Sequence, residues 1–324
     1  MYVTRTPLRI TLGGGGTDLP DFYRNSEYGF LIAASITKYV YIAVHENFDR
    51  DILLKYSEIE RVSDLEQIQH PILRECIRAT GIENGFALSS MADIPTGTGL
   101  GSSGSFTVGV LRALRAFMHL PSTPDYLAKA ASDIEINKLE QPVGKQDQYI
   151  AAFGGLTAFT FRHDESVGVE HLAISDTTRF ELSTNLMMFY TGIRRGASDV
   201  ITNEIINNSK TSLRDNLLAV RDLGLLTRDA LVSGNLHRFG ELLTEQWNLK
   251  HSRQPSLINE TVDNWIQAGI KAGATGGKLI GAGEGGFLLF YSTRHTELRN
   301  AMSIIGLSEI PFGFDYEGSL LITV

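Results

Sequence analysis

Glycine and serine residues at positions 97–105 form a segment that could bind an anion. Directly after this segment, GTGLGSSGS, apolar residues recur at helical spacing. Backbone N–H groups at the start of a helix can converge on one anion, and the helix dipole adds positive charge behind them. We therefore predict a phosphate-binding loop. It is not a Walker loop, because no lysine follows the glycines.

Hydroxyl groups are unusually dense in this loop. Serine is a preferred N-cap residue, so we expect one of them to cap the helix. One cap does not require Ser102, Ser103 and Ser105 together. The remaining hydroxyls are therefore candidates to coordinate phosphate or a metal ion.

Two carboxylates follow the loop, Glu135 on a predicted helix and Asp147 just beyond it at the Gly144 turn. Taken alone, the first could be a solvated helix face and the second a helix cap. Beside a phosphate loop, however, acidic residues suggest a magnesium ligand and a base. The spacing alone leaves both roles open, and only the combination with the loop points to catalysis.

Other catalytic motifs receive less support. GxGxxG occurs twice, at 99–104 and 281–286, but neither copy has the ribose-binding carboxylate that should end a second strand about 20 residues later. A nicotinamide-dependent oxidoreductase remains an alternative on this pattern alone. The sequence contains no HExxH and no Gly-x-Ser-x-Gly elbow with a partner, so zinc hydrolases and serine esterases are not expected.

Composition excludes several classes of partner. The 29 basic and 37 acidic residues give a formal net charge of −8, so no general positive field is available for nucleic acid. Cys76 is the single cysteine and can form neither an intrachain disulfide nor a cysteine zinc site. The N-terminus lacks a signal-peptide core, and no run approaches the ~18 apolar residues of a membrane span. We expect a cytoplasmic protein without a membrane partner.

The elements that must position these residues form two α+β domains, predicted at 1–180 and 181–324. Short runs rich in β-branched and aromatic residues predict strands, and apolar residues at helical spacing predict helices. The predicted strands are 3–12, 29–36, 38–44, 85–90, 184–192, the two ends of 277–291, and 319–324. The predicted helices are 105–120, 124–140, 212–228, 235–251, 256–272 and 293–306.

Three glycine clusters, taken in order, resemble the motifs of the GHMP kinases, and the resemblance spans nearly the whole chain. PTGTGLGSSGS is similar to the family motif that wraps the ATP phosphates. The resemblance implies an N-terminal ribosomal-S5-like domain and a C-terminal ferredoxin-like domain. It also implies nucleotide contacts from Pro95, Gly97, Gly99, Leu100, Gly101, Ser102, Ser103, Gly104 and Ser105.

The same resemblance assigns roles outside the nucleotide loop. GKQDQY is similar to the segment that holds the family's catalytic aspartate, here Asp147, and TPLRITLGGGGTD supplies a basic partner, Arg9, close to it. Ser103 and Glu135 fall on the family's magnesium ligands. The first and third glycine motifs imply substrate contacts from Gly15, Gly16, Thr17, Asp18, Gly283 and Gly285.

The opening TPLRITLGGGGTDLP and the segment YTGIRRGAS are most similar to the branch that phosphorylates D-glycero-D-manno-heptose 7-phosphate. This implies transfer from ATP, with Mg²⁺, to the anomeric hydroxyl, giving the 1,7-bisphosphate for nucleotide-activated heptose synthesis. Arg194, Arg195 and Lys145 are the expected cations for the sugar phosphate.

Several alternatives remain at this stage. One is a family kinase for fucose, mannose or galactose, of which galactose is disfavoured by the missing Gly-Glu-His before Thr17. Another is a non-catalytic nucleotide- or sugar-binding protein. Sensing predicts loss of the base or of the metal ligands, and both Asp147 and Glu135 are present. The candidate assembly is a homodimer.

Overall fold

The protein was analysed as a computed structural model that describes residues 1–193, 210–253, 260–281 and 285–323. Its larger sheet has eight strands, of which six follow the order β12-β1-β2-β5-β3-β4, while β6 pairs with β2 and β7. The bounds are β1 Tyr2–Gly13, β2 Tyr28–Glu46, β3 Ile52–Lys55, β4 Ile59–Val62, β5 Phe86–Ala92, β6 Leu156–Arg162, β7 Val167–His171 and β12 Leu320–Thr323.

Strand β2 organises this sheet. It merges the two strands predicted at 29–36 and 38–44, because no glycine or proline interrupts the segment between them. Residues 28–34 pair with β6 and residues 40–46 pair with β5, while residues 32–44 pair with β1 along the opposite edge. One strand therefore connects both ends of the sheet.

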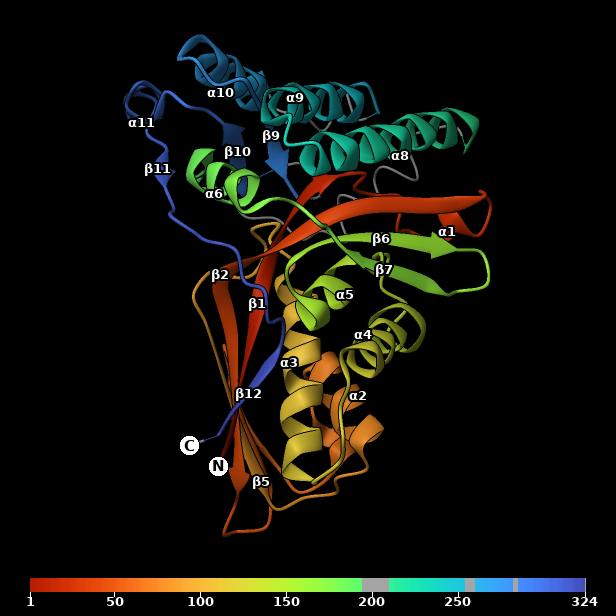
Figure 1. The fold of residues 1–324 in the computed structure, drawn as a ribbon. Helices are drawn as coiled ribbons and strands as arrows, with labels where there is room; N and C mark the ends of the chain where they lie inside the picture. The colour runs from red at the N-terminus through yellow and green to blue at the C-terminus, as the bar shows by residue number, and fades with distance from the viewer. Residues whose placement is uncertain (194–209, 254–259, 282–284, 324) are drawn as a thin grey trace.

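Helices cover one face of this sheet (Figure 1). α3 packs against β1 and β2 and buries Val108, Leu111 and Leu114 completely. The bounds are α1 Pro20–Tyr23, η1 Leu65–Gln67, α2 Pro71–Thr80, α3 Ser102–Phe117, α4 Pro124–Ser132, η2 Asp133–Lys138 and α5 Gln146–Phe153. The helix predicted at 124–140 is thus α4 followed by η2, a π-helical turn of the kind often found at functional sites.

The second sheet is antiparallel, with the order β11-β8-β10-β9. Alternate residues of its strands point to opposite faces, so Met188 joins the main core while Met187 and Phe189 join a second cluster. Both faces are therefore buried. The bounds are α6 Asp176–Asn185, β8 Leu186–Tyr190, α8 Lys210–Val232, α9 Leu236–Arg253, α10 Glu260–Lys271, β9 Gly276–Ile280, β10 Phe287–Tyr291, α11 His295–Ile304 and β11 Ser308–Glu309.

Two connections join the sheets. α8 packs against β1 and β2 of the first sheet and against α9, which covers β9. The final strand, β12, returns to the first sheet and pairs antiparallel with β1, so the two ends of the chain lie close together in Figure 1. The α+β class matches the prediction, while the division at residues 180 and 181 stays a prediction. None of the described helices is long and apolar enough to cross a membrane.

Candidate active site

An arginine–aspartate pair joins β1 to the start of α5. Arg9 Nε donates to Asp147 Oδ1 at 2.7 Å, and its Nη1 donates to the Gly99 carbonyl. Arg9 is buried, whereas the Asp147 side chain keeps 27 % of its surface exposed. The pair predicted from the sequence therefore forms, and its carboxylate faces an open space.

The glycine loop touches this pair directly. A Cβ atom on Gly101 would lie 3.1 Å from Asp147 Cγ, and one on Gly104 would lie 2.6 Å from Asp147 Cβ. Gly101 has φ +74°, which is left-handed backbone that other residues rarely adopt. Glycine at both positions lets the loop lie against the carboxylate.

The N-terminus of α3 carries no side-chain cap. Gly101 is the N-cap residue, and no side chain accepts a hydrogen bond from the first turn. The predicted serine cap is therefore wrong. Uncapped N–H groups at a helix start are unsatisfied donors with the positive end of the helix dipole behind them, which suits a bound phosphate.

The third glycine cluster meets this loop. A Cβ on Gly281 would lie 2.5 Å from Gly99 Cα, and one on Gly286 would lie 2.1 Å from the Thr98 carbonyl oxygen. Gly281 and Gly286 therefore lie backbone to backbone against the glycine loop. Gly285 contacts Ile193 instead, because its Cβ would lie 2.5 Å from Ile193 Cγ2.

Ser103 and Glu135 form the candidate metal site. Ser103 Oγ donates to Glu135 Oε2 at 2.7 Å, and Glu135 Oε1 is buried without a hydrogen-bond partner. Burial raises the pKa of Glu135, and the Ser103 hydrogen bond opposes that rise. A buried acceptor with no partner is a position that a cation can satisfy.

The two oxygens of this site fit Mg²⁺. It prefers oxygen ligands and binds few protein groups when substrate phosphates complete the shell. Among the described residues no group of three His, Cys, Asp or Glu side chains could hold a metal ion. Nucleotide phosphate oxygens and water would complete the shell of a magnesium ion here.

The turn after β1 and the start of α5 meet at Asp18. Its Oδ2 accepts a hydrogen bond from the Gln146 backbone N–H at 3.0 Å, and a Cβ on Gly144 would lie 1.9 Å from that oxygen. Burial raises the pKa of Asp18, the Gln146 hydrogen bond lowers it, and repulsion from Asp147 raises it further. Asp18 therefore fixes the segment that carries Asp147.

A cavity opens beside this arrangement. On one side it is lined by β1, the following turn and the start of α5, including Arg9, Asp18 and Asp147. On the other side it is lined by α8, α9 and β9. Asp147 thus lies between the glycine loop and a cavity built from both sheets.

Comparison with known proteins identifies this arrangement. The family model for the GHMP kinases N terminal domain matches residues 68–155, and the model for the GHMP kinases C terminal domain matches residues 227–306. The chain belongs to the GHMP kinases. This confirms the resemblance in the glycine motifs. The chain is therefore a kinase, and kinases of this family use ATP as a substrate.

Individual relatives agree with the family. The chain is 28% identical over 303 residues to D-glycero-alpha-D-manno-heptose 7-phosphate kinase of Campylobacter jejuni, covering 89% of this chain and 88% of that one. It is 24% identical to a galactokinase of Pyrococcus furiosus, covering 87% and 86%. The crystal structure of a D-glycero-D-manno-heptose 1-phosphate kinase from Bacteroides thetaiotaomicron has a TM-score of 0.83 at 24% identity, covering 100% and 99%, and establishes the fold.

The oxidoreductase alternative fails within this GHMP kinase fold. A dinucleotide GxGxxG joins a strand to a helix and a second parallel strand. Here Gly281 and Gly286 lie at the connection between β9 and β10, which pair antiparallel. The earlier copy precedes α3, but β5 pairs antiparallel with β2, and parallel only with β3, which precedes it in the chain.

Three predicted contact residues of this kinase face the core instead. Ser105 is fully buried and its hydroxyl donates to the Pro7 carbonyl at 2.7 Å. Thr17 is fully buried and its hydroxyl donates to the Gly14 and Phe30 carbonyls. The Leu100 side chain is likewise buried. Their side chains hold the loops in place, so a contact of these residues with a ligand would have to come from the backbone, and it stays a prediction.

The roles of the remaining loop residues stay predictions, and the structure gives their positions. Pro95 is exposed, and its carbonyl accepts the Thr98 hydroxyl at 3.0 Å. Gly97 and Gly99 adopt φ +76° and +81°. Ser102 opens α3 beside Ser103. In the first glycine turn, Gly15 and Gly16 line the cavity.

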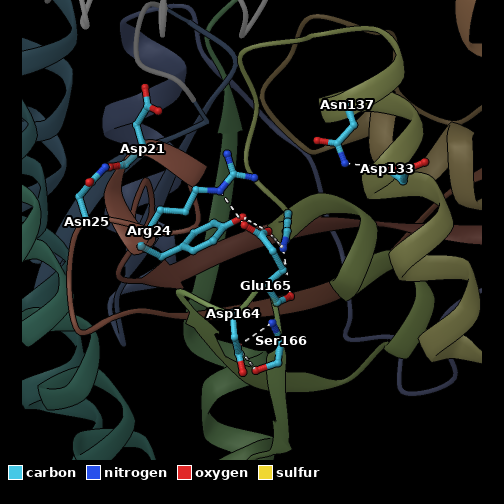
Figure 2. A network of polar contacts seen from close by, with 10 residues as sticks. Asp21, Arg24, Asn25, Asp133, Asn137, Asp164, Glu165 and Ser166 are labelled. Carbon is cyan, nitrogen blue, oxygen red and sulfur yellow. Dashed lines mark hydrogen bonds and ion pairs between the residues drawn. The ribbon is translucent and has the colours of Figure 1, made fainter.

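Lys145 does not serve the cavity. Its Nζ donates to Glu165 Oε2 at 2.6 Å and lies 5.0 Å from the centre of the Tyr23 ring. Glu165 also accepts from Arg24 and Tyr23, and Figure 2 shows Arg24 reaching it. The expectation that Lys145 is available for a substrate phosphate is therefore wrong. Arg194, Arg195 and Gly283 lie outside the described residues.

The structure adds residues that the sequence analysis missed. Gln146 links the catalytic pair to β1, because its Nε2 donates to Asp147 Oδ1 at 3.2 Å and its Oε1 accepts from Thr11 at 2.6 Å. Lys250, Arg253 and Lys278 line the far side of the cavity. The GKQDQY motif contains Gln146, but no local pattern marks the three cations.

Proposed function

We propose that the chain transfers the γ-phosphoryl group of ATP to the anomeric hydroxyl of D-glycero-D-manno-heptose 7-phosphate, giving the 1,7-bisphosphate. The observation that carries this proposal is the place of Asp147, between an uncapped glycine loop and a cavity with several cationic side chains. The similarity to the Campylobacter jejuni heptose 7-phosphate kinase supports the choice of acceptor.

In this mechanism the glycine loop holds the ATP phosphates through the N–H groups at the start of α3. The acceptor hydroxyl oxygen forms the new bond to the γ-phosphorus, and the bond from that phosphorus to the β–γ bridging oxygen breaks, releasing ADP. Asp147 takes the hydroxyl proton. Most of the rate comes from positioning and charge stabilisation, as is general for phosphoryl transfer.

Arg9 and Gln146 act on Asp147 from two directions. Each donates to Oδ1, at 2.7 Å and 3.2 Å, which leaves Oδ2 for the acceptor hydroxyl. Ser103 and Glu135 would hold Mg²⁺, which supplies neutralisation of the charge that develops on the phosphates. The buried, unpartnered Glu135 Oε1 supports this assignment.

A coupled assay for ADP release over four acceptors tests the proposal: heptose 7-phosphate, mannose, fucose and galactose. We expect turnover of heptose 7-phosphate, with a product whose new phosphorus signal couples to the anomeric proton in ³¹P spectra. Faster turnover of an unphosphorylated sugar would replace the proposal by a hexose or deoxyhexose kinase. Binding of ATP without turnover of any acceptor would favour the sensing alternative.

A further inference from the structure

The charged groups that line the cavity are distributed unevenly. Its far side, formed by α9 and β9, carries Lys250, Arg253 and Lys278. The two carboxylates, Asp18 and Asp147, lie on the opposite side. The whole chain has a net charge of −8, so a concentration of positive charge here runs against its overall balance.

Lys278 is buried in this wall. Its side chain is 7 % exposed, and its Nζ donates to the Leu12 carbonyl at 3.1 Å and to Gln246 Oε1 at 2.9 Å. Both acceptors are neutral, and no acidic side chain in the described parts of the chain forms a salt bridge with it. A buried cation without a counter-ion is costly. An anion bound in the cavity would remove that cost.

Burial, together with repulsion by Lys250 and Arg9, lowers the pKa of Lys278 to about 7. Arg9 is itself neutralised by Asp147. Lys250 donates to the Gly281 carbonyl, and Arg253 donates to Asn216 Oδ1 at 3.2 Å. These contacts hold both side chains on the far side of the cavity, where Lys278 also lies.

We propose that Lys278, together with Lys250 and Arg253, binds a phosphate group carried by the acceptor. The inference rests on the proposed function, which it deepens by naming the residues that select a phosphorylated acceptor. The same cavity contains Asp147 on its other side. An acceptor held by its phosphate at α9 and β9 therefore presents the remainder of the molecule to the carboxylate.

The first test replaces Lys278 by methionine, which keeps the length of the side chain and removes its charge. Lys271→Met, at the exposed end of α10, is the matched control. We expect Lys278→Met to lower kcat/KM for heptose 7-phosphate by about 10- to 150-fold, the range for one charge-assisted hydrogen bond. The kcat/KM for heptose without phosphate should fall much less, so the preference for the phosphorylated sugar is the readout, and Lys271→Met should keep that preference.

The second test does not need turnover. Thermal unfolding is followed with and without inorganic phosphate, at constant ionic strength, with ADP present to fill the glycine loop. Phosphate should raise the Tm of the wild type and of Lys271→Met, and raise that of Lys278→Met distinctly less. This difference would support the anion site even if the wild type turned over neither sugar, in which case only the proposed function would fail.

Two further variants guard against misfolding of Lys278→Met. Lys250→Met and Arg253→Met, in the last turn of α9, should each lower the preference for the phosphorylated sugar. A preference that stays unchanged in every cavity variant that folds would overturn the inference. So would a wild type that shows neither a preference for the phosphorylated sugar nor stabilisation by phosphate.

Discussion

The two walls of the cavity treat positive charge differently. On the wall of β1 and α5, Arg9 pairs with Asp147 and Lys145 pairs with Glu165. On the wall of α9 and β9, Lys278 is equally buried but contacts neutral oxygens. A buried cation matched within the protein holds architecture together, whereas one left with neutral partners is suited to an anion from outside. We call the side formed by β1 and α5 the wall for chemistry, and the side formed by α9 and β9 the wall for selection.

The largest effect should come from the wall for chemistry. Asp147→Asn keeps the shape and hydrogen bonding of the side chain but removes its charge, so kcat should fall by about 10²-fold or more, with the KM of ATP nearly unchanged. Steady-state kinetics on heptose 7-phosphate measure this. Asp125→Asn, an exposed residue on α4, is the control and should behave like the wild type. Near-normal turnover of Asp147→Asn would erase the distinction between the walls.

The next effect concerns magnesium. Ser103→Ala and Glu135→Gln each remove one oxygen ligand, so the magnesium concentration for half-maximal rate should rise about tenfold or more. Even mutation of a residue that only hydrogen-bonds to a metal ligand costs about 10- to 100-fold in metal affinity. Magnesium titrations of the initial rate measure it. Ser105→Ala is the matched control, because that hydroxyl bonds Pro7 instead. It should lower the Tm and leave the magnesium titration unchanged. Superimposed titrations for all three variants would contradict the metal assignment.

A smaller effect sharpens the wall for selection. The pKa of Lys278 is about 7 in the folded chain, below its ordinary value of 10.5, because it is buried near Lys250 and Arg9. Between these values the unfolded chain binds more protons, so this residue makes stability rise with pH from about 7 upward. Urea unfolding at several pH values should show that rise in the wild type and its loss in Lys278→Met. Parallel pH profiles would mean that the lysine is not a buried charge.

The smallest effect tests the matched lysine. Burial raises the pKa of Glu165, but hydrogen bonds from Arg24, Lys145 and Tyr23 outweigh it and hold the pKa at about 2. The carboxylate therefore contributes stability above about pH 4.5 that is lost as the pH falls toward 2. Glu165→Gln should cost about 1 kcal/mol at neutral pH, since the pair stays partly exposed.

Acid titration of the unfolding free energy checks this effect. The variant should lose less stability between pH 4.5 and 2 than the wild type does. Glu170→Gln, an exposed residue in the same hairpin, is the control and should follow the wild type throughout. An unchanged acid limb in Glu165→Gln would mean that Lys145 is not neutralised by this carboxylate.

The sequence was sufficient to predict those parts of the site whose residues are adjacent in the chain. The glycine loop and α3 form one stretch, so their local pattern and the family motif sufficed. The short helix α5 escaped, because Gln146–Phe153 is only two turns long and has a weak apolar stripe. The prediction of a serine cap was wrong because the N-cap residue is Gly101, which has a left-handed backbone conformation.

Charges that meet through the fold could not be predicted locally. Lys145 forms an ion pair with Glu165 at the tip of the β6–β7 hairpin, and the segment GKQDQY contains no pattern that predicts this partner. Lys278 lies on a strand buried on both faces, where alternation of polar and apolar residues carries little information. Its approach to Lys250 and Arg9 depends on β9 meeting the end of β1, which is a property of the whole chain.

The return of β12 to β1 has a consequence for synthesis on the ribosome. β1 is made well before β12, the strand that pairs with Tyr2 to Arg5 along its outer edge. While the chain is being translated, that edge offers unpaired N–H and C=O groups, which are a template for joining another nascent chain. A polysome that carries many copies therefore brings exposed β1 edges close together. Slower translation should lengthen this exposure, and chaperones that cover strand edges should matter most for this protein before β12 has been made.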